Sequence, residues 1–226
     1  MKKRHIEQVF ELLVKEYGYR QWQSRSDPVS ELIQTILSQN TSDVNSHRAF
    51  VSLVSSFPDW KAIAQAGIKD ISASIRSGGL ADVKAKYIKQ ALEYIYQKHG
   101  DLELEFLKQL SMEEARDWLM QIPGVGIKTA SCVLLFSLCM PSFPVDTHVF
   151  RVAKKLGLLD SKISVDQAHR LLEKMVPVND IFTFHITLIE HGRKICKAQR
   201  PHCHDCIMQQ ICPGRENQAE LKNKTT

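Results

Sequence analysis

The chain has 226 residues, of which 43% are hydrophobic and 24% charged, so it can bury one large core or two small ones. Lys and Arg outnumber Asp and Glu by 30 to 25, and this net charge of +5 favours an anionic partner without identifying it. No apolar stretch is long enough to span a bilayer, and residues 1–7 lack the apolar core of a signal peptide. The composition excludes an integral membrane protein and predicts a soluble, intracellular one.

Apolar residues recur at helical spacing along most of the chain, and no segment shows the apolar–polar alternation of a half-buried strand. We therefore predict an all-α protein. The first helix is expected to end before Gly18. Asp27 and Pro28 form an N-cap and first-turn pair that begins the second, and Ser42 is expected to cap the third.

The middle of the chain is divided by glycines and by a helix-capping motif. Gly78-Gly79 precede an amphipathic stretch over residues 83–95, which Gly100 is expected to end. Ser111 and Glu114 have the spacing of a capping box, so a helix is predicted over residues 112–121.

Four further helices are expected in the second half of the chain, and one of them follows Asp146. One begins at Ile127, continues through Leu138 and ends before two prolines, and another begins at a capping box formed by Ser164 and Gln167. The last long helix carries an apolar face over residues 182–189 and is expected to stop at Gly192. The polar tail over residues 214–226 is predicted to be disordered.

Residues 123–126, Pro-Gly-Val-Gly, join the helices on either side in a very tight turn. We attribute both Gly124 and Gly126 to the freedom of glycine at positive φ. The start of the second helix would present unpaired amides and a positive dipole end to a phosphate, and so hold DNA without reading its sequence. A plain corner between two packed helices would show the same pattern.

Lys128 and Asp146 are the candidate catalytic residues. Lys128 lies in the first turn of the predicted helix, where the positive end of the helix dipole disfavours the protonated amine. A neutral amine there could attack a sugar C1′ and form a Schiff base, although a solvated surface lysine is the simpler interpretation. Asp146 precedes an apolar helical run, so it is either an N-cap or a carboxylate that stabilises charge on the sugar.

Four of the six cysteines lie within seventeen residues, in the run Cys196-x6-Cys203-x2-Cys206-x5-Cys212. Four thiolates can hold a four-iron cubane or a tetrahedral zinc ion, although a zinc ribbon usually has two Cys-x2-Cys pairs and only one is present. The surrounding basic residues would suit a phosphate-binding loop, and a solvated basic loop is the alternative. They are Arg193, Lys194, Lys197 and Arg200.

These pieces together resemble the endonuclease III family of DNA glycosylases over nearly the whole chain. The resemblance rests on residues 123–130, 145–148 and 191–193, on the cysteine run, on residues 37–43, and on Gly79-Leu80 with Lys84-Ala85. It implies a six-helix domain with a helix–hairpin–helix over residues 26–141. It further implies a [4Fe–4S] cluster domain built from residues 1–25 and 142–226, with DNA bound in the cleft between the two domains.

The same resemblance implies a role for each site residue. Lys128 matches the Schiff-base nucleophile, Asp146 the catalytic carboxylate, and the four cysteines the cluster ligands. Asn40 aligns with the side chain that fills the gap left by a flipped base, and Leu80 with the wedge that enters the stack. The DNA-binding set is Gln39, Asn40, Leu80, Gly124, Gly126, His148, Arg193, Lys197 and Arg200.

The resemblance implies a monomeric, cytoplasmic, nucleoid-associated enzyme of base excision repair that acts on duplex DNA with damaged bases or abasic sites. Lys128 favours a bifunctional glycosylase and lyase for oxidised pyrimidines such as thymine glycol. Familiar members of the family have Gln at the position of Asn40 and Arg at the position of Ile127. The range of lesions that this chain accepts is therefore expected to differ from theirs. The alternatives are a uracil or thymine mismatch glycosylase and a non-catalytic iron–sulfur module that binds DNA.

Overall fold

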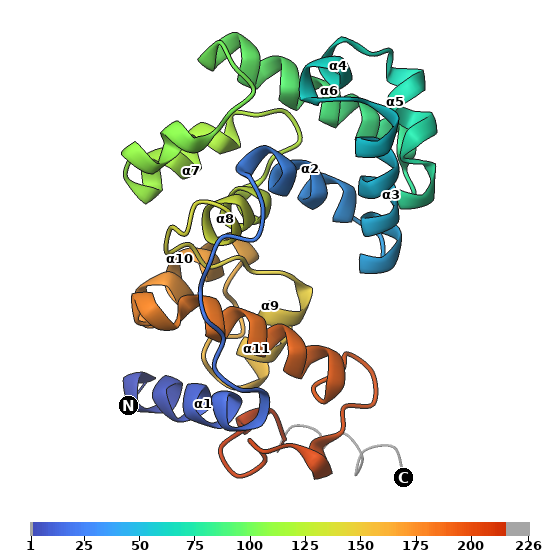
Figure 1. Ribbon diagram of the computed structural model, residues 1–226. Coiled ribbons are helices and arrows are strands. Elements are labelled where there is room, and N and C mark those ends of the chain that lie inside the picture. The colour runs from blue at the N-terminus through green and yellow to red at the C-terminus, as the bar shows by residue number, and fades with distance from the viewer. Residues whose placement is uncertain (1, 216–226) are drawn as a thin grey trace. The chain divides into compact units, whose positions relative to one another are not determined.

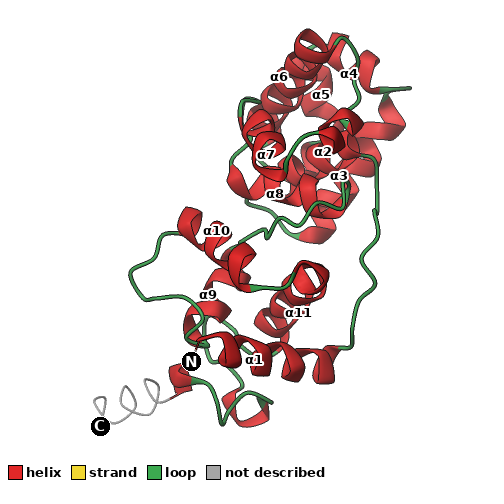
Figure 2. Ribbon diagram, turned by 90° about the vertical axis from the view of Figure 1, so that its left-hand side faces the viewer, coloured by secondary structure: helices red, strands yellow, loops and turns green. Residues whose placement is uncertain are grey.

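The computed structural model describes residues 2–215, and all of their regular structure is helical, as Figures 1 and 2 show. The prediction of an all-α protein is therefore confirmed for the described residues. The chain divides into two compact units: the core unit, residues 23–140, and the terminal unit, residues 1–22 with 141–226. None of the described helices combines the length and the apolar character needed to cross a membrane.

In the core unit, α2 packs against both α3 and α8, and α6 packs against α4 and α5. The apolar face of α2 is fully buried at Leu32, Ile33, Ile36 and Leu37, which makes this helix the centre of the unit's hydrophobic core. The helices are α2 (Pro28–Ser38), α3 (Asp43–Ser56), α4 (Trp60–Gln65), α5 (Ile68–Ser74), α6 (Ala81–His99), α7 (Met112–Met120) and α8 (Ile127–Phe136). Short 3₁₀ turns are η1 (Arg76–Gly78) and η2 (Glu105–Gln109).

In the terminal unit, α11 packs against both α1 and α9, so helices from the two ends of the chain share one core. Aromatic edges fill the space around this helix, because Phe10 and Phe143 both contact the Phe184 ring. The helices are α1 (Lys2–Tyr17), α9 (Thr147–Lys155), α10 (Val165–Met175) and α11 (Ile181–Lys194). The 3₁₀ turns are η3 (Val178–Asp180), η4 (Cys203–Asp205) and η5 (Pro213–Arg215).

The predicted N-caps at Asp27, Ser42, Ser111 and Ser164 are confirmed, because each side chain accepts a hydrogen bond from an amide three residues further on. The Asp27 carboxylate accepts the Ser30 N–H at 2.9 Å, and Ser42 caps α3 in the same way. Both predicted capping boxes are present, at Ser111 and at Ser164. Gly100 ends α6 in the left-handed conformation, as predicted.

The expected end of the last long helix was wrong, because α11 continues through Gly192 to Lys194. A Cβ at Gly192 would lie 3.0 Å from the His148 Cβ and 3.2 Å from the Val152 Cγ2. The glycine therefore permits α11 to pack closely on α9 and does not end the helix.

Three other expectations differ from the structure or fall partly outside it. Helix α8 ends at Phe136, two residues before Leu138, and the prolines lie beyond its end. The units divide at residues 22/23 and 140/141, whereas divisions after 25 and 141 were expected. Of the tail predicted to be disordered, Gly214 and Arg215 lie in η5, and residues 216–226 lie outside the described residues.

Candidate functional site

The centre of the candidate site is the hairpin between α7 and α8. Gly124 adopts φ +81°, and a Cβ at this position would lie 2.7 Å from the Tyr87 ring. The turn is closed by hydrogen bonds from Ile122 N to Leu119 O and from Val125 N to Ile122 O. Gly124 is thus required both for its backbone conformation and for close packing on α6.

Gly126 has a different role from the one predicted. Its φ is −96°, which any residue can adopt, so the expectation of a positive φ was wrong at this position. Gly126 is the N-cap of α8 and provides no side-chain hydrogen bond, and a Cβ there would meet no atom within 4 Å. The first hydrogen bond of α8 runs from Ala130 N to Gly126 O, so the amides of residues 127–129 precede it at an uncapped helix start.

Lys128 is the second residue of α8 and is partly buried. Within the core unit its ammonium has no hydrogen-bond or ion-pair partner. The Lys128 side chain can therefore reach a ligand that is bound at the free amides of residues 127–129.

Two other loops of the core unit carry predicted site residues, and both are held in an unusual backbone conformation. Asn40, just past the end of α2, has φ +52°, and Leu80, the N-cap of α6, has φ +50°. Leu80 is 57% exposed although it is a large apolar residue. Gln39 reaches the hairpin, because its Nε2 lies 3.5 Å from Gly124 O. Left-handed backbone at non-glycine residues stores strain, which is concentrated at functional sites.

In the terminal unit, Asp146 is the predicted N-cap of α9, and its Oδ1 accepts the Val149 N–H at 2.7 Å. No described group of the same unit donates to its Oδ2. His148, one residue into α9, is partly buried, and its Nδ1 lies 3.1 Å from the Arg151 Nη2. Because the guanidinium only donates, Nδ1 accepts, and neutral His148 carries its proton on Nε2.

The four cysteines of the run gather at the end of α11 and in the turns that follow it. Burial raises the pKa of the Cys196, Cys206 and Cys212 thiols, and the charges of neighbouring cysteines raise each of them further. The Lys155 ammonium acts in the opposite direction on Cys196 and Cys212. Among the described residues, no three His, Cys, Asp or Glu side chains are placed to hold a single metal ion.

A histidine connects this cysteine group to the first helix. His191 Nδ1 lies 3.0 Å from the Tyr17 hydroxyl, and its Nε2 lies 3.7 Å from the Cys206 Sγ. Burial lowers the pKa of His191 to about 4, and burial also raises the pKa of Tyr17. The phenol and the imidazole are therefore both neutral near pH 7.

Arg193, in the last turn of α11, is exposed, as are Lys197 and Arg200 in the basic loop that follows the helix. Arg200 has φ +49°, another left-handed non-glycine residue. Lys194, by contrast, is paired with Glu190 at 2.7 Å. Lys197 and Arg200 have no acidic partner among the described residues, which leaves their charge available to an anion.

Sequence reasoning did not identify the roles of Lys84 and Arg151, each of which donates to a distant backbone carbonyl, 47 residues away for Lys84 and 41 residues away for Arg151. Lys84 Nζ lies 2.8 Å from both Leu37 O and Gly78 O. Arg151 donates to Gly192 O and Cys196 O, at 2.9 and 3.0 Å. The available signals were a positive charge in a predicted helix and, for Lys84, its place in one of the segments that carry the family resemblance, and neither signal indicates burial.

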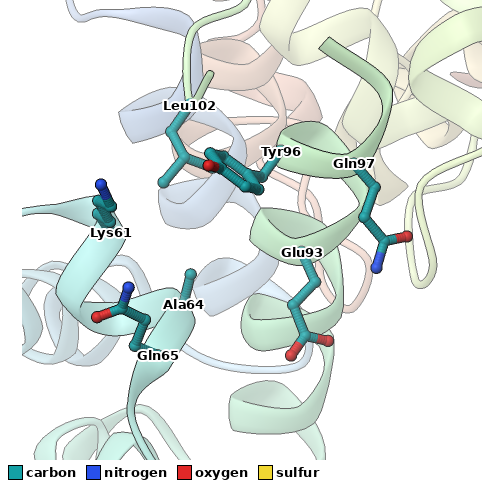
Figure 3. Close-up of a pocket in the computed structure, with 7 residues that line it drawn as sticks. All are labelled: Lys61, Ala64, Gln65, Glu93, Tyr96, Gln97 and Leu102. Atoms are coloured by element: carbon teal, nitrogen blue, oxygen red, sulfur yellow. The ribbon is translucent and has the colours of Figure 1, made fainter. Parts of the chain in front are cut away.

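A separate pocket of about 210 Å³ lies between α4 and α6 in the core unit. Figure 3 shows Lys61, Ala64 and Gln65 on one side and Glu93, Tyr96 and Gln97 on the other. It contains none of the predicted site residues.

Comparison with known proteins identifies the family to which the chain belongs. Residues 33–178 match the model of the HhH-GPD superfamily of base excision DNA repair proteins. A putative DNA glycosylase of Arabidopsis thaliana is 44% identical over 73% of this chain, which spans 56% of that protein's length. Endonuclease III of Sulfolobus acidocaldarius is 36% identical over 80% of this chain and 79% of its own. A trapped endonuclease III–DNA covalent intermediate superposes with a TM-score of 0.83 at 27% identity, over 96% of this chain and 98% of that one.

Proposed function

Because the chain belongs to the HhH-GPD superfamily of base excision DNA repair proteins, we propose that it is a bifunctional DNA glycosylase and abasic-site lyase for oxidised pyrimidines of the thymine glycol type. The observation that carries the proposal is Lys128 in the first turn of α8, beside the uncapped amides of the hairpin. A phosphate on those amides would bring a deoxyribose within reach of the lysine.

The chemistry begins with the neutral Lys128 amine, which attacks C1′ of the damaged nucleotide. The glycosidic bond breaks, and the base leaves with the electron pair and takes up a proton. The C1′–O4′ bond then breaks as Nζ gives up a proton and O4′ takes one up, which leaves a Schiff base between C1′ and Nζ. Loss of a proton from C2′ breaks the C3′–O3′ bond and expels the 3′ phosphate. Water hydrolyses the imine and restores Lys128.

Asp146 would assist this reaction through the oxygen that is not used for capping. Oδ1 is occupied by the Val149 N–H, whereas Oδ2 would be left to accept a proton or to stabilise the positive charge that develops on the sugar. His148 follows in the first turn of α9, with Nε2–H available as a donor to the lesion.

Base extrusion would use the two strained loops of the core unit. An exposed apolar side chain such as Leu80 can enter the base stack, and the Asn40 amide can bond to the base left without a partner. The hairpin amides, together with Lys197 and Arg200, would bind phosphates without regard to sequence.

We propose that Cys196, Cys203, Cys206 and Cys212 hold a [4Fe–4S] cluster. The donor set fits, because four thiols follow one another in the turns after α11, with Cys206 buried and the other three partly buried, and two cationic residues, Arg151 and Lys155, lie beside them. Each of the four cysteines would ligate one iron of the cubane, whereas a single zinc ion would need all four sulfurs at one centre, and no three described His, Cys, Asp or Glu side chains are placed to hold a single ion. When bound, the cluster would cross-link the basic loop and supply a redox centre.

The activity is tested with purified protein and duplexes that carry thymine glycol, uracil or a thymine–guanine mismatch. Release of thymine glycol with strand cleavage in the absence of alkali is expected. Excision only of uracil or mismatched thymine would replace the oxidised-pyrimidine assignment with a mismatch glycosylase. Binding without any excision would indicate a non-catalytic module.

The cofactor is tested separately by metal and sulfide analysis with visible absorbance. About four irons and four sulfides per chain and a brown protein are expected. A colourless protein with one or more zinc ions would contradict the cluster.

A further inference from the structure

The side chain of Lys84 joins the two loops that carry Asn40 and Leu80. Lys84 is only 2% exposed, and its ammonium donates to Leu37 O and Gly78 O, each at 2.8 Å. Leu37 lies three residues before Asn40, and Gly78 lies two residues before Leu80. The Lys84 backbone N–H also donates to Leu80 O at 3.0 Å. One residue therefore contacts both loops and one of the strained residues directly.

This arrangement is more costly than packing alone would require. No carboxylate among the described residues pairs with Lys84, and burial lowers the pKa of its ammonium. An apolar side chain would fill the same space without that desolvation cost, but it could not bond two carbonyls. The favourable features are the two hydrogen bonds and the position of the charge at the carbonyl end of α2.

The neighbouring contacts leave these loops little other freedom. A Cβ on Gly78 would lie 3.0 Å from the Ala49 Cβ, so this turn is already pressed against α3. Gln39, which follows α2, contacts the hairpin carbonyl of Gly124. The ammonium thus fixes the end of α2 relative to η1, and with it the separation of Asn40 and Leu80.

We propose that Lys84 is a positioning residue for base extrusion, holding the gap-filling and wedge loops at the spacing needed to enter the base stack together. The proposal rests on the proposed roles of Asn40 and Leu80. It assigns Lys84 to the step that precedes bond cleavage, because its ammonium is enclosed by protein carbonyls and is not available to substrate.

The test uses binding, so it does not depend on catalysis. A duplex carries a non-cleavable tetrahydrofuran abasic analogue opposite 2-aminopurine, whose fluorescence rises when it is unstacked. Wild-type protein should raise the fluorescence on binding. Lys84→Met should bind with a similar Kd by anisotropy but give a much smaller rise, whereas Lys86→Met, an exposed control on the same helix, should match the wild type.

Catalysis provides a second comparison. Lys84→Met should slow single-turnover excision of a paired thymine glycol by on the order of 10²-fold, with a smaller effect on cleavage of a preformed abasic site. Active fractions measured by covalent trapping correct for unfolded protein. Equal slowing on both substrates, or a wild-type fluorescence rise in the variant, would overturn the proposal.

If Lys84→Met does not fold, Lys84→Gln replaces it, because the Gln amide can donate to both carbonyls. Lys84→Gln is then combined with Leu80→Ala in a double-mutant cycle. If Lys84 acts through Leu80, the two effects on the fluorescence rise will be less than additive. Additive effects would contradict the proposal. If the wild-type protein raises the fluorescence but excises no base, the proposed glycosylase activity would be contradicted and the role of Lys84 would remain supported.

Discussion

The Tyr17 hydroxyl lies 3.0 Å from the His191 Nδ1, and the opposite nitrogen of the same ring lies 3.7 Å from the Cys206 Sγ. If the phenol donates to Nδ1, neutral His191 carries its proton on Nε2, facing the sulfur. The protonated ring also donates through Nε2, so both protonation states present an N–H to Cys206. A helix at the start of the chain thereby orients a donor to a proposed cluster ligand near its end.

Replacing this donor should change the redox potential of the proposed [4Fe–4S] cluster. An N–H bonded to a cysteine sulfur stabilises the more negative, reduced state, so His191→Phe should shift the midpoint potential to a more negative value. Tyr17→Phe should shift it in the same direction by less, because the ring remains. Voltammetry of the brown protein measures both variants, and equal potentials in all three proteins would refute a role for this contact.

The two hairpin glycines should respond differently to the same substitution. Gly124→Ala places a Cβ against the Tyr87 ring in left-handed backbone, so it should cost about 1–3 kcal/mol of unfolding free energy. Gly126→Ala meets open space at an ordinary φ and should change stability little, but its methyl group should weaken binding to every duplex. Urea unfolding and anisotropy separate the two effects. Unchanged affinity in Gly126→Ala would argue against phosphate binding at α8.

The Arg25–Glu31 pair should be the most important of the ion pairs described in the core unit for stability. Glu31 is fully buried, and Arg25 donates to it at 2.8 Å while its guanidinium lies 3.9 Å from the centre of the Phe136 ring. Arg25→Ala leaves the Glu31 carboxylate with only the Ser26 and Thr35 hydroxyls as donors. The loss should be roughly 2–3 kcal/mol of unfolding free energy, which is less than for a fully buried pair because the Arg25 side chain is 54% exposed.

The matched control is Arg20→Ala, which removes an exposed pair with Glu190 at 3.4 Å. It should cost less than about 1 kcal/mol in urea unfolding. Similar losses of unfolding free energy in Arg25→Ala and Arg20→Ala would show that burial of Glu31 does not determine how much an ion pair contributes to stability.

The capping box of α7 should give a pH-dependent contribution to stability. Hydrogen bonds from Ser111 lower the pKa of Glu114 below its ordinary 4.5. A group with a depressed folded pKa stabilises the protein above the unfolded value, and this contribution is lost as the pH falls through the folded pKa. The stability difference between wild type and Ser111→Ala should therefore be largest above pH 4.5 and shrink below it. Thermal unfolding across that range is the measurement, and a constant difference would contradict it.

Helix starts could be predicted from the sequence because their causes are local. Asp27, Ser111 and Ser164 each bond to an amide three residues away, so the pattern contains both partners. The failures depend on contacts between distant segments. Gly192 in the sequence indicates a helix end, but in the structure it allows α9 to pack closely on α11. Gly126 in the sequence indicates a left-handed turn residue, but its φ in the structure is ordinary.

The candidate site divides in the same way. Lys128 and Asp146 could be identified because a helix start and a cap have sequence signals. Lys84 could not, because the carbonyls it bonds carry no side-chain identity, and one of them is 47 residues away. The short helices α4 and α5 gave too few turns for a periodic signal.

The most direct test of the proposed mechanism is borohydride trapping of the protein on a duplex with a single thymine glycol. A Schiff base at Lys128 predicts a covalent protein–DNA adduct in the wild type and in Lys108→Ala, an exposed lysine control, and none in Lys128→Ala. An adduct that persists in Lys128→Ala, or wild-type base release with no adduct, would contradict Lys128 as the nucleophile.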